Sequence, residues 1–449
     1  MTIAGQTFTV TQSAGSVNPV PGPTPSAFGP CSAPRFRATI SYPVGRQPAG
    51  MASGDFNGDT FPDMAVTNQG ATQAPGGVSI LLNNGAGGFR AAGNYSAGTT
   101  PISVAAGDFN RDGKLDLAVA NRDSADVSVL MGNGDGAFGA AKNFGAGASA
   151  RFVTTADFNR DGRLDLAVAN GLANNVSILL GDGGGGFGAA MNYPTGSSPL
   201  AIAIADFNGD GISDLVVATV NSAFSVLLGN GAGGFTAGVD LPRIGLLTGI
   251  ASGDFNGDGK ADLVVATAFT SSNILILPGN GTGGFGAPDF TDINNIPGGG
   301  AGFRTSPNAI TVADVNADGR ADLLTANRDG TVTVLLGEGN GRFKPAASFL
   351  AGGASLNALA ADDFDGDGRI DVTTDFNGAS GGFVSLLFGD GAGGVGAPSA
   401  RAAMRRLATG DFNRDGKLDL IGGDVLSRTY SVLLGDGRGG FAASAYNTG

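Results

Sequence analysis

Residues 108–116 read DFNRDGKLD, and this nine-residue phrase decides the fold because it recurs along the chain. Phrases of this form begin eight times in 449 residues, at intervals of 48 to 60 residues. About 30 residues after each start comes a second phrase close to G-N-G-x-G-G-F. A period of this length is the signature of a repeat architecture. The eight phrases begin at Asp55, Asp108, Asp157, Asp206, Asp254, Asp314, Asp363 and Asp411.

Short apolar runs lie between the two phrases. In the second repeat they occupy residues 102–109, 115–120 and 127–132, and a weaker run follows at 138–145. Short runs rich in Val, Ile, Leu and Ala and bounded by Gly, Asn or Asp are typical of buried strands. Each repeat is therefore predicted to form a four-stranded antiparallel sheet. Because one such sheet cannot bury both faces, we expect the sheets to pack radially around an axis.

The predicted fold class is all-β, a β-propeller of eight four-stranded blades, since eight repeats are present. A seven-bladed ring with a surplus repeat is the alternative. The phenylalanine after each leading aspartate, such as Phe109, is expected to pack between neighbouring sheets. Alanine and glycine in each first strand suit the crowded axis.

The repeated phrase has the chemistry of a metal loop. Oxygen-bearing side chains stand at positions 1, 3, 5 and 9, as in Asp108, Asn110, Asp112 and Asp116. Gly113 at position 6 permits a tight turn, after which the carbonyl of position 7 can point inward. This arrangement matches the first half of an EF-hand loop with its last acid moved from position 12 to 9. Flexible, charged oxygen ligands favour Ca²⁺ over Mg²⁺.

Eight such loops predict up to eight calcium ions. The first loop has Thr60 in place of glycine and Pro62 at position 8, so weaker binding is expected there. The seventh loop has a fourth carboxylate, Asp365, so tighter binding is expected. The predicted metal-binding residues are Asp55, Asn57, Asp59, Phe61, Asp63, Asp108, Asn110, Asp112, Lys114, Asp116, Asp157, Asn159, Asp161, Arg163, Asp165, Asp206, Asn208, Asp210, Ile212, Asp214, Asp254, Asn256, Asp258, Lys260, Asp262, Asp314, Asn316, Asp318, Arg320, Asp322, Asp363, Asp365, Asp367, Arg369, Asp371, Asp411, Asn413, Asp415, Lys417 and Asp419, with position 7 acting through its carbonyl.

Electrostatics point to a structural role for these ions. Two unit charges about 4 Å apart repel by about 4 kcal/mol at an effective dielectric constant of 20. Loops that hold three or four carboxylates are therefore expected to loosen without a cation, and the fold is predicted to depend on calcium.

The composition excludes several function classes. The chain has no histidine and a single cysteine, Cys31, which excludes a Ser-His-Asp triad, His-ligated zinc and an intramolecular disulfide. It has no apolar run of about 18 residues that could span a membrane. The net charge of −13 argues against a nucleic-acid partner, provided that the acids lie on the surface.

The metal loops alter that charge argument. They hold 25 of the 39 acidic residues, which leaves 14 acids against 26 bases in the rest of the chain. Eight bound divalent cations would turn the net charge of −13 into about +3. An acidic glycan therefore becomes a reasonable candidate ligand.

The paired phrases, such as DFNGDGKADLVVA at 254–266 and GNGTGGFGAP at 279–288, resemble FG-GAP or VCBS repeats of the integrin α-chain propeller type. The resemblance covers roughly Phe36 to Gly449. It implies a propeller whose calcium loops join the first and second strands of each blade on one face. It also implies that ligands bind the opposite face. The number of loops departs from the family, which usually has seven blades.

The N-terminal part carries a surplus strand phrase. Residues 36–45 parallel the fourth-strand phrase at 187–196, although eight blades need only eight outer strands. The surplus strand is expected to close the ring by pairing with the last blade; the alternative is pairing with another molecule. Residues 1–12 resemble the closing hairpin of a BACON-type immunoglobulin-like domain, 13–34 are predicted to be a Pro/Gly/Ser-rich linker, and 35–449 to be the propeller.

The predicted function is that of a non-enzymatic, calcium-binding adhesion or ligand-binding module that recognises protein or glycan. The alternatives are a lectin with repeated sugar sites, the propeller of a polysaccharide-active enzyme, and a structural or filament subunit. A secreted or cell-surface location is expected because extracellular calcium modules bind at about 10⁻⁴–10⁻³ M. We expect a monomer without nucleic-acid partner or membrane insertion, with strand exchange as a possible route to assembly. Polar loops on a rigid scaffold are the candidate ligand sites, namely Asn121, Arg122, Asp123, Asn327, Arg328 and Asp329.

Overall fold

A computed structural model describes most of the chain. The described residues are 2–3, 6–7, 40–70, 76–85, 88–220, 224–238, 241, 246–268, 273–292, 306–353, 355–378 and 381–391, with four further strands at 404–410, 419–424, 429–435 and 441–447. Within these ranges we find no helix that is long and apolar enough to cross a membrane.

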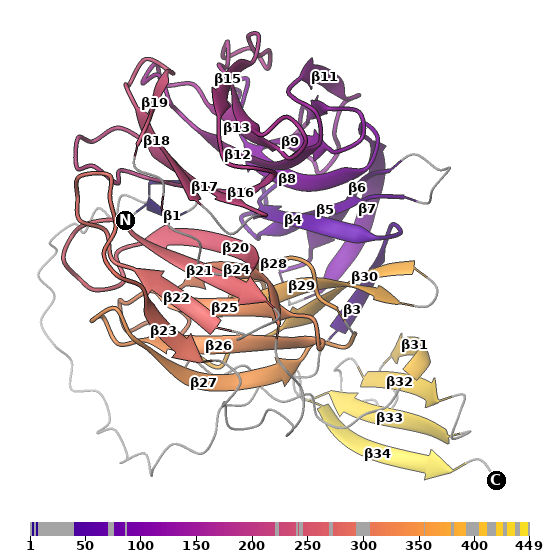
Figure 1. Cartoon of the computed structure of the whole chain (residues 1–449). Coiled ribbons are helices and arrows are strands. Elements are labelled where there is room, and N and C mark those ends of the chain that lie inside the picture. Colours follow the sequence, from indigo (N-terminus) through magenta and orange to yellow (C-terminus); the bar gives the residue numbers. More distant parts are fainter. Residues whose placement is uncertain are drawn as a thin grey trace, which may run out of the picture.

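Seven four-stranded antiparallel sheets are arranged as the blades of a ring (Figure 1). Blades 1 to 6 each take four consecutive strands from one repeat. They are β4 (Pro48–Gly54), β5 (Asp63–Asn68), β6 (Gly77–Asn83) and β7 (Phe89–Ser96); β8 (Pro101–Gly107), β9 (Asp116–Asn121), β10 (Asp126–Leu130) and β11 (Lys142–Gly145); β12 (Ala150–Ala156), β13 (Asp165–Asn170), β14 (Asn175–Leu179) and β15 (Met191–Pro194); β16 (Pro199–Ala205), β17 (Asp214–Thr219), β18 (Phe224–Gly229) and β19 (Phe235–Ala237); β20 (Leu246–Gly253), β21 (Asp262–Ala268), β22 (Asn273–Leu277) and β23 (Asp289–Asp292); β24 (Pro307–Ala313), β25 (Asp322–Asn327), β26 (Thr331–Gly337) and β27 (Phe343–Leu350).

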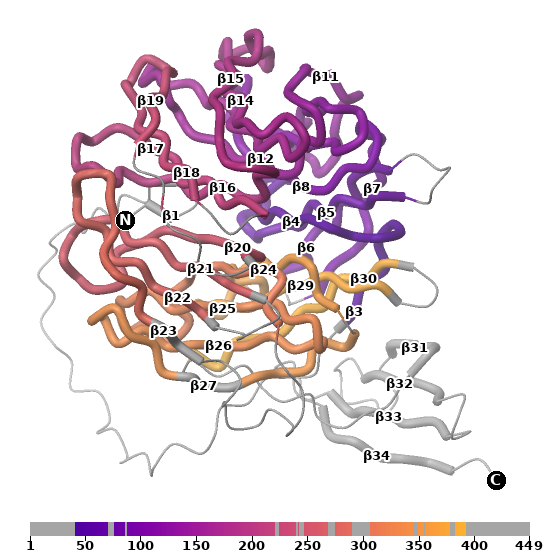
Figure 2. Tube along the Cα trace, in the orientation of Figure 1, coloured from indigo at the N-terminus to yellow at the C-terminus, as the bar shows by residue number. Residues whose placement is uncertain are grey.

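Blade 7 is built from two distant parts of the chain. Its first three strands are β28 (Leu359–Asp362), β29 (Asp371–Gly378) and β30 (Gly381–Leu387), and its outer strand is β3 (Ile40–Val44). In the register of this pairing Tyr42 lies opposite Val384. The Cα trace shows the early strand β3 beside the late strand β30 (Figure 2). The N-terminal strand therefore closes the ring, as predicted, but it does so as the outer strand of the seventh blade and not by pairing with the last repeat.

The prediction of eight blades in the ring was wrong, and the seven-bladed alternative is confirmed. The first strands contact one another in a closed cycle, in the order β4, β8, β12, β16, β20, β24, β28 and again β4. Because β3 completes the seventh sheet, blade 7 meets blade 1 and the ring is full. The eighth repeat forms a separate four-stranded sheet of β31 (Met404–Gly410), β32 (Asp419–Asp424), β33 (Thr429–Gly435) and β34 (Phe441–Asn447).

Packing between blades buries the middle strands on both faces. Every residue of β9 and of β13 is buried, for example. Aromatic pairs join neighbouring blades, since Phe56 of blade 1 meets Phe138 of blade 2 edge to face at 5.5 Å. The same pairing closes the ring, where Phe364 of blade 7 meets Phe89 of blade 1 at 5.6 Å. The predicted packing of these phenylalanines between sheets is thus confirmed, and each pair adds about 0.5–1.5 kcal/mol beyond area burial.

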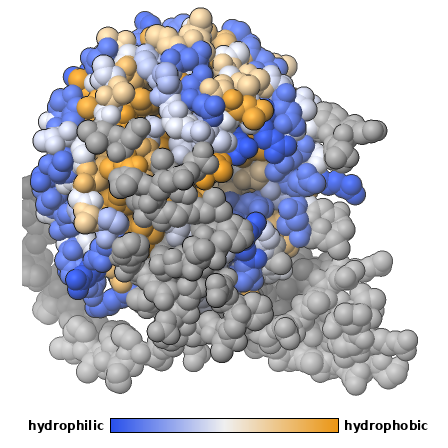
Figure 3. Space-filling view, in the orientation of Figure 1, coloured by the Kyte–Doolittle hydropathy of each residue, from blue (hydrophilic) through white to orange (hydrophobic). Residues whose placement is uncertain are grey.

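The first strands are less covered than the middle strands. On the face seen in Figure 3, hydrophilic residues dominate the rim and hydrophobic residues gather toward the middle.

At the N-terminus, β1 (Thr2–Ile3) and β2 (Gln6–Thr7) pair as a short hairpin. Its assignment to a BACON-type domain stays a prediction. The predicted linker at 13–34, with Cys31, lies outside the described residues.

Candidate metal centres

Each described acidic loop joins the first and second strands of its blade. In blade 2 the loop leaves β8 at Gly107 and enters β9 at Asp116. The seven ring blades repeat this placement, so the loops share one face of the propeller. In the eighth repeat only Asp419 falls within a described strand, and residues 411–418 lie outside the described part.

The side chains at positions 1, 3 and 5 bind the backbone of their own loop. In blade 2 Asp108 accepts hydrogen bonds from the N–H groups of Asp112 at 3.1 Å and Gly113 at 2.9 Å. Asn110 Oδ1 accepts the N–H of Asp112 at 2.9 Å. Asp112 Oδ1 accepts the N–H of Lys114 at 3.0 Å. The same four bonds occur in all seven ring blades, so each loop is curled with its side-chain oxygens held in place.

Two left-handed residues make this curl possible. Positions 4 and 6 have positive φ, as at Arg111 (62°) and Gly113 (82°). Glycine adopts this conformation without a steric penalty, whereas a β-branched residue is a true outlier there. In blade 1 position 6 is Thr60 at φ 75°, so this loop holds a β-branched residue in the left-handed region where the other six ring loops have glycine.

The acid at position 9 has a structural role that the spacing alone did not predict. Asp116 is fully buried, and its two oxygens accept the N–H groups of Phe109 at 2.9 Å and Gly132 at 2.8 Å. Gly132 is the second residue after β10 (Asp126–Leu130), so Asp116 ties the loop to the segment that follows this strand. All seven ring blades repeat both bonds. A carboxylate has about four lone-pair sites, so these bonds leave acceptor capacity for a cation.

Burial makes the ninth acid costly to ionise. Desolvation raises the pKa of Asp63, Asp165 and Asp322 to about 6, and the charges at positions 1 and 5 of the same loop add to the rise. In blade 7 desolvation and the Asp365 charge raise the pKa of Asp371 to about 8. A cation among these oxygens would favour the ionised form. The donor set therefore fits a hard divalent cation.

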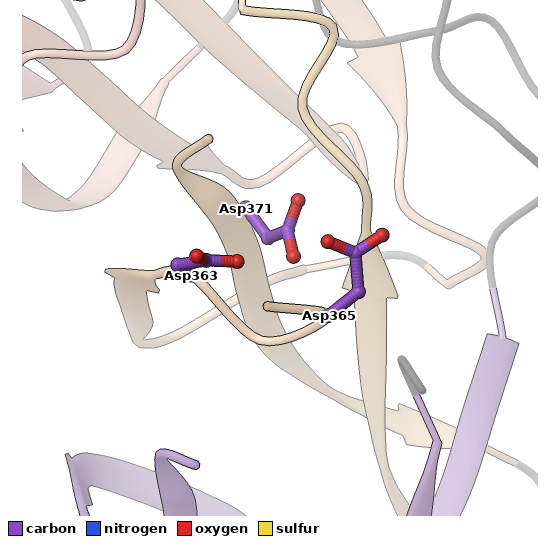
Figure 4. Close-up of side chains that lie close together, drawn as sticks. All are labelled: Asp363, Asp365 and Asp371. Carbon is purple, nitrogen blue, oxygen red and sulfur yellow. The ribbon is translucent and has the colours of Figure 1, made fainter. Parts of the chain in front are cut away.

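Among the loops that the structure describes, the loop of blade 7 brings three acids together most closely. Carboxylate oxygens of Asp363, Asp365 and Asp371 lie within 4.8 Å of one another, and the three side chains converge in Figure 4. The fourth acid, Asp367, instead lies 3.5 Å from the Arg369 guanidinium. The same contact between positions 5 and 7 recurs in other loops, for example between Asp161 and Arg163 at 3.4 Å.

Glycines of the next blade hold the metal loop from outside. The N–H of Gly136 in blade 2 donates to the carbonyl of Phe56 in the blade 1 loop at 2.9 Å. The N–H of Gly283 in blade 5 donates to the carbonyl of Phe207 in blade 4, also at 2.9 Å. These glycines belong to the second repeated phrase. Its nearly constant distance from the first phrase was the only feature of the sequence that could have indicated the contact. The acidic loop of one blade is thus hydrogen-bonded to the next blade, so the loop conformation and the packing of the two blades depend on each other.

The predicted ligand-binding residues fall into two groups. Asn121 and Asn327 are fully buried, and their side chains bond within their own blades, for instance Asn121 Nδ2 to Ser128 Oγ at 2.8 Å. Arg122 pairs with Asp123 at 2.9 Å on the exposed loop after β9. Arg328 is exposed. Asp329 accepts the N–H of Thr331, the first residue of β26, at 3.1 Å. The two triplets lie in blades 2 and 6, which are not neighbours in the ring.

Comparison with known proteins agrees with this geometry. Two solved structures of BBS1N in complex with ARL6DN are similar to the chain at 13% identity, and each comparison covers 79% of this chain and 97% of that chain. The TM-score is 0.56 for the mercury-soaked crystal and 0.54 for the lead-soaked crystal. At this identity the likeness shows the fold alone. A search of the curated proteins found no match.

The repeats themselves match a family model. The model for FG-GAP-like repeats matches residues 55–119, 108–168, 157–217, 206–265, 254–325 and 314–374. These matches span the acidic loops and buried strands of blades 1 to 6 and reach into blade 7. Because they cover more than half of the chain, the chain belongs to the FG-GAP-like repeat family.

Proposed function

We propose that this propeller is a calcium-binding, non-enzymatic module that recognises an extracellular protein or glycan. The observation that carries the proposal is the repeated loop, in which oxygen ligands are held by the same four backbone bonds in seven blades. Oxygen-only donor sets with several carboxylates select calcium among the common cations. The absence of histidine from the chain removes the commonest general base and supports a binding role.

Each of these positions in the loop would supply a different oxygen ligand to the ion. Positions 1, 3 and 5 would supply side-chain oxygens, position 7 its carbonyl, and position 9 a buried carboxylate. When bound, calcium would supply positive charge that offsets the repulsion among these acids. Because the glycine N–H of the next blade is bonded to the same loop, loop order would be transmitted to blade packing. An extracellular location follows if the sites bind at about 10⁻⁴–10⁻³ M, as in other extracellular modules.

The proposal is tested by titrating the calcium-free chain with calcium in a calorimeter and by melting it with calcium or with excess chelator. We expect several sites and a higher melting temperature in calcium, since a site saturated about 100-fold adds about 2.7 kcal/mol. A melting temperature that excess chelator leaves unchanged would falsify the proposal.

A matched pair of variants in blade 3 controls for charge. Asp157→Asn removes a charge from position 1 of the metal loop. Asp182→Asn removes the same charge from the loop before the outer strand, where blades 4 and 5 carry Asn230 and Asn280. We expect the first variant to lose one calcium site and the second to keep all sites.

A further inference from the structure

Position 7 of the metal loops, which we number after their blades, follows a rule with two exceptions. In five of the seven ring loops it is lysine or arginine, and its charged group lies 3.4–3.8 Å from the aspartate at position 5. Loop 1 has Phe61 at this position, and loop 4 has the shorter, unbranched-charge-free Ile212. Loop 4 therefore has the smallest side chain of its own at position 7 among the ring loops.

The side chain at position 7 covers a glycine in the second phrase of the same blade. A Cβ added to Gly183 of blade 3 would lie 3.0 Å from Cδ of Arg163. In blade 4 a Cβ added to Gly231 would lie 3.3 Å from Cδ1 of Ile212, and 3.6 Å from Cδ of Arg160. Arg160 belongs to loop 3, where it stands at position 4. The short side chain of Ile212 thus leaves room for an arginine from the neighbouring loop.

Arg160 extends past this glycine to the backbone of loop 4. Its Nη2 donates a hydrogen bond to the carbonyl oxygen of Gly211. The N–H of the same peptide group belongs to Ile212 and donates to Oδ1 of Asp210 at 2.8 Å. Arg160 therefore holds the peptide group that fixes the acid at position 5 of loop 4, directly before the carbonyl of position 7. Because it binds a carbonyl there, it leaves the carboxylates of loop 4 available to an ion.

The conformation of loop 3 does not require an arginine at position 4. This position has positive φ in all seven ring loops, and four of them carry glycine there, which adopts this conformation without a steric penalty. Arg160 adopts it at φ 60°, although its side chain bonds to the next loop. The arginine is thus kept at a position where glycine would serve the local turn.

Arg111 of loop 2 provides an internal comparison. It stands at the same position as Arg160 and has φ 62°, but the next loop carries its own arginine at position 7. A Cβ added to Gly211 of loop 4 would lie 3.3 Å from Nη2 of Arg160. A Cβ added to Gly162, the equivalent residue of loop 3, would meet none of the described atoms within 4 Å. The contact between loops is therefore specific to loops 3 and 4 in this pair of comparisons.

We propose that Arg160 couples the metal sites of loops 3 and 4, an inference that rests on the calcium binding proposed above. Calcium in loop 3 would order the backbone at Arg160 and hold its side chain against Gly211. Loop 4 would then need less ordering when its own ion binds, and its affinity would rise. Because coupling of binding free energies is reciprocal, calcium in loop 4 would favour calcium in loop 3 by the same factor. Arg160 would thus act as a positioning residue for loop 4.

Ile212 offers a probe of loop 4 alone, since no other metal loop has isoleucine at position 7. The test follows its isotope-labelled methyl group by NMR while the full chain is titrated with calcium, and Ile212→Leu assigns the signal. We expect Arg160→Gly to raise the calcium concentration at the midpoint of this signal by about fivefold. Arg111→Gly is the matched control, which makes the same change in loop 2 and should shift the midpoint by less than about twofold.

A second arm distinguishes coupling from a local effect of the arginine. Asp157→Asn removes a carboxylate from loop 3 and should shift the Ile212 midpoint in the wild-type background, but not further in Arg160→Gly. Equal midpoints in wild type and Arg160→Gly, or equal effects of Asp157→Asn in both backgrounds, would overturn the coupling.

Both arginine variants are expected to fold, because each places glycine where four ring loops already have it. Calorimetry with calcium on the same samples separates the two proposals. A chain that binds calcium with an unchanged Ile212 midpoint in Arg160→Gly refutes only the coupling, whereas a chain that binds no calcium refutes the proposed function and the coupling with it.

Discussion

The metal loops of blades 7 and 1 lie on either side of the ring closure and represent opposite extremes. Loop 7 holds three acids with oxygens within 4.8 Å, and the pKa of Asp371 is raised to about 8. Loop 1 holds Thr60 at φ 75°, and the pKa of Asp63 is raised only to about 6. One loop concentrates charge and the other concentrates backbone strain. The comparison shows that the same nine-residue frame tolerates two different costs while keeping the same hydrogen bonds.

The two loops also touch. A Cβ added to Gly366 of loop 7 would lie 3.1 Å from the Phe61 ring of loop 1. Asn83 Nδ2 of blade 1 donates to the carbonyl of Phe364 in blade 7 at 2.8 Å. Changes in either loop are therefore expected to affect the closure of the ring as well as the loop itself.

The largest effect is expected from removing the ninth acid, through Asp63→Ala in blade 1 or Asp371→Ala in blade 7. Each variant leaves two buried N–H groups without an acceptor, at about 1–3 kcal/mol for each group. In chelator at pH 7 the loss should be smaller for Asp371→Ala, because Asp371 bears the greater ionisation cost. Denaturant unfolding of both variants measures this, and a larger loss for Asp371→Ala would contradict the comparison of the loops.

The next largest effect is on the pH dependence of the free energy of unfolding, through a buried acid of blade 7 near the closure of the ring. Asp375 of β29 is fully buried, accepts the N–H groups of Asn357 at 2.9 Å and Ala358 at 2.7 Å, and stands where blades 2 to 6 carry alanine and blade 1 carries Thr67. Desolvation raises the pKa of Asp375 from 3.8 to about 6. A raised carboxyl pKa contributes stability that is present below the unfolded value and is lost as pH rises through the folded value.

Stability should therefore fall between about pH 4 and pH 6 by up to about 3 kcal/mol from this residue alone. Asp375→Asn should flatten that part of the pH profile of the free energy of unfolding. Asp135→Asn, on the exposed loop before β11 of blade 2, is the control that should leave this part of the profile unchanged. An unaltered profile in Asp375→Asn would remove the buried acid as its cause.

A smaller effect is expected from Asp365→Asn, which gives loop 7 the asparagine of the other loops. Lower repulsion in the absence of calcium should raise the stability in chelator by about 1 kcal/mol, since the side chain is partly solvated. Calcium affinity at this loop should fall, because a carboxylate ligand is lost. Calorimetric titration and unfolding in chelator check both directions; a loss of stability in chelator would show that the convergence of the three acids is not a burden.

An effect of similar size, with backbone strain in place of charge as its cause, is expected from Thr60→Gly in loop 1. Relief of the left-handed threonine should stabilise the chain by about 1 kcal/mol. Gly113→Thr in blade 2 is the reverse change and should destabilise by about 1–2 kcal/mol. Thermal melts of both variants measure the pair, and equal signs for the two changes would exclude backbone strain as the explanation.

Much of this could be predicted from the sequence because each repeat states the same pattern again. The strand order, the loop positions and the packing of residues such as Phe109 follow from periodicity. The number of blades did not, because it depends on which strand completes the seventh sheet. One sign was present, since the seventh repeat has Val395 where the other second phrases have phenylalanine. The decisive fact, the pairing of β3 with β30, involves residues more than 300 positions apart.

The candidate site divides in the same way. Side-chain oxygens at regular spacing predict the metal loops, but spacing does not reveal which oxygens also hold the backbone. The double role of Asp116 depends on the N–H of Gly132, and no local pattern brings these two residues together. Similarly, Asn121 was predicted to face a ligand because it sits in a loop-like triplet, whereas its side chain is buried within the blade.

The pairing of β3 with β30 also fixes the order in which the molecule can be completed. Tyr42 leaves the ribosome early, yet its partner Val384 is made 342 residues later. Blades 1 to 6 can form in sequence as they emerge, while β3 must wait without a partner until the other three strands of blade 7 have been made. The entropy of closing so long a loop rises only with the logarithm of its length, so the delay costs time more than stability. We therefore expect the ring to close as the last step of folding, and to open first at this seam when the chain is pulled from its ends.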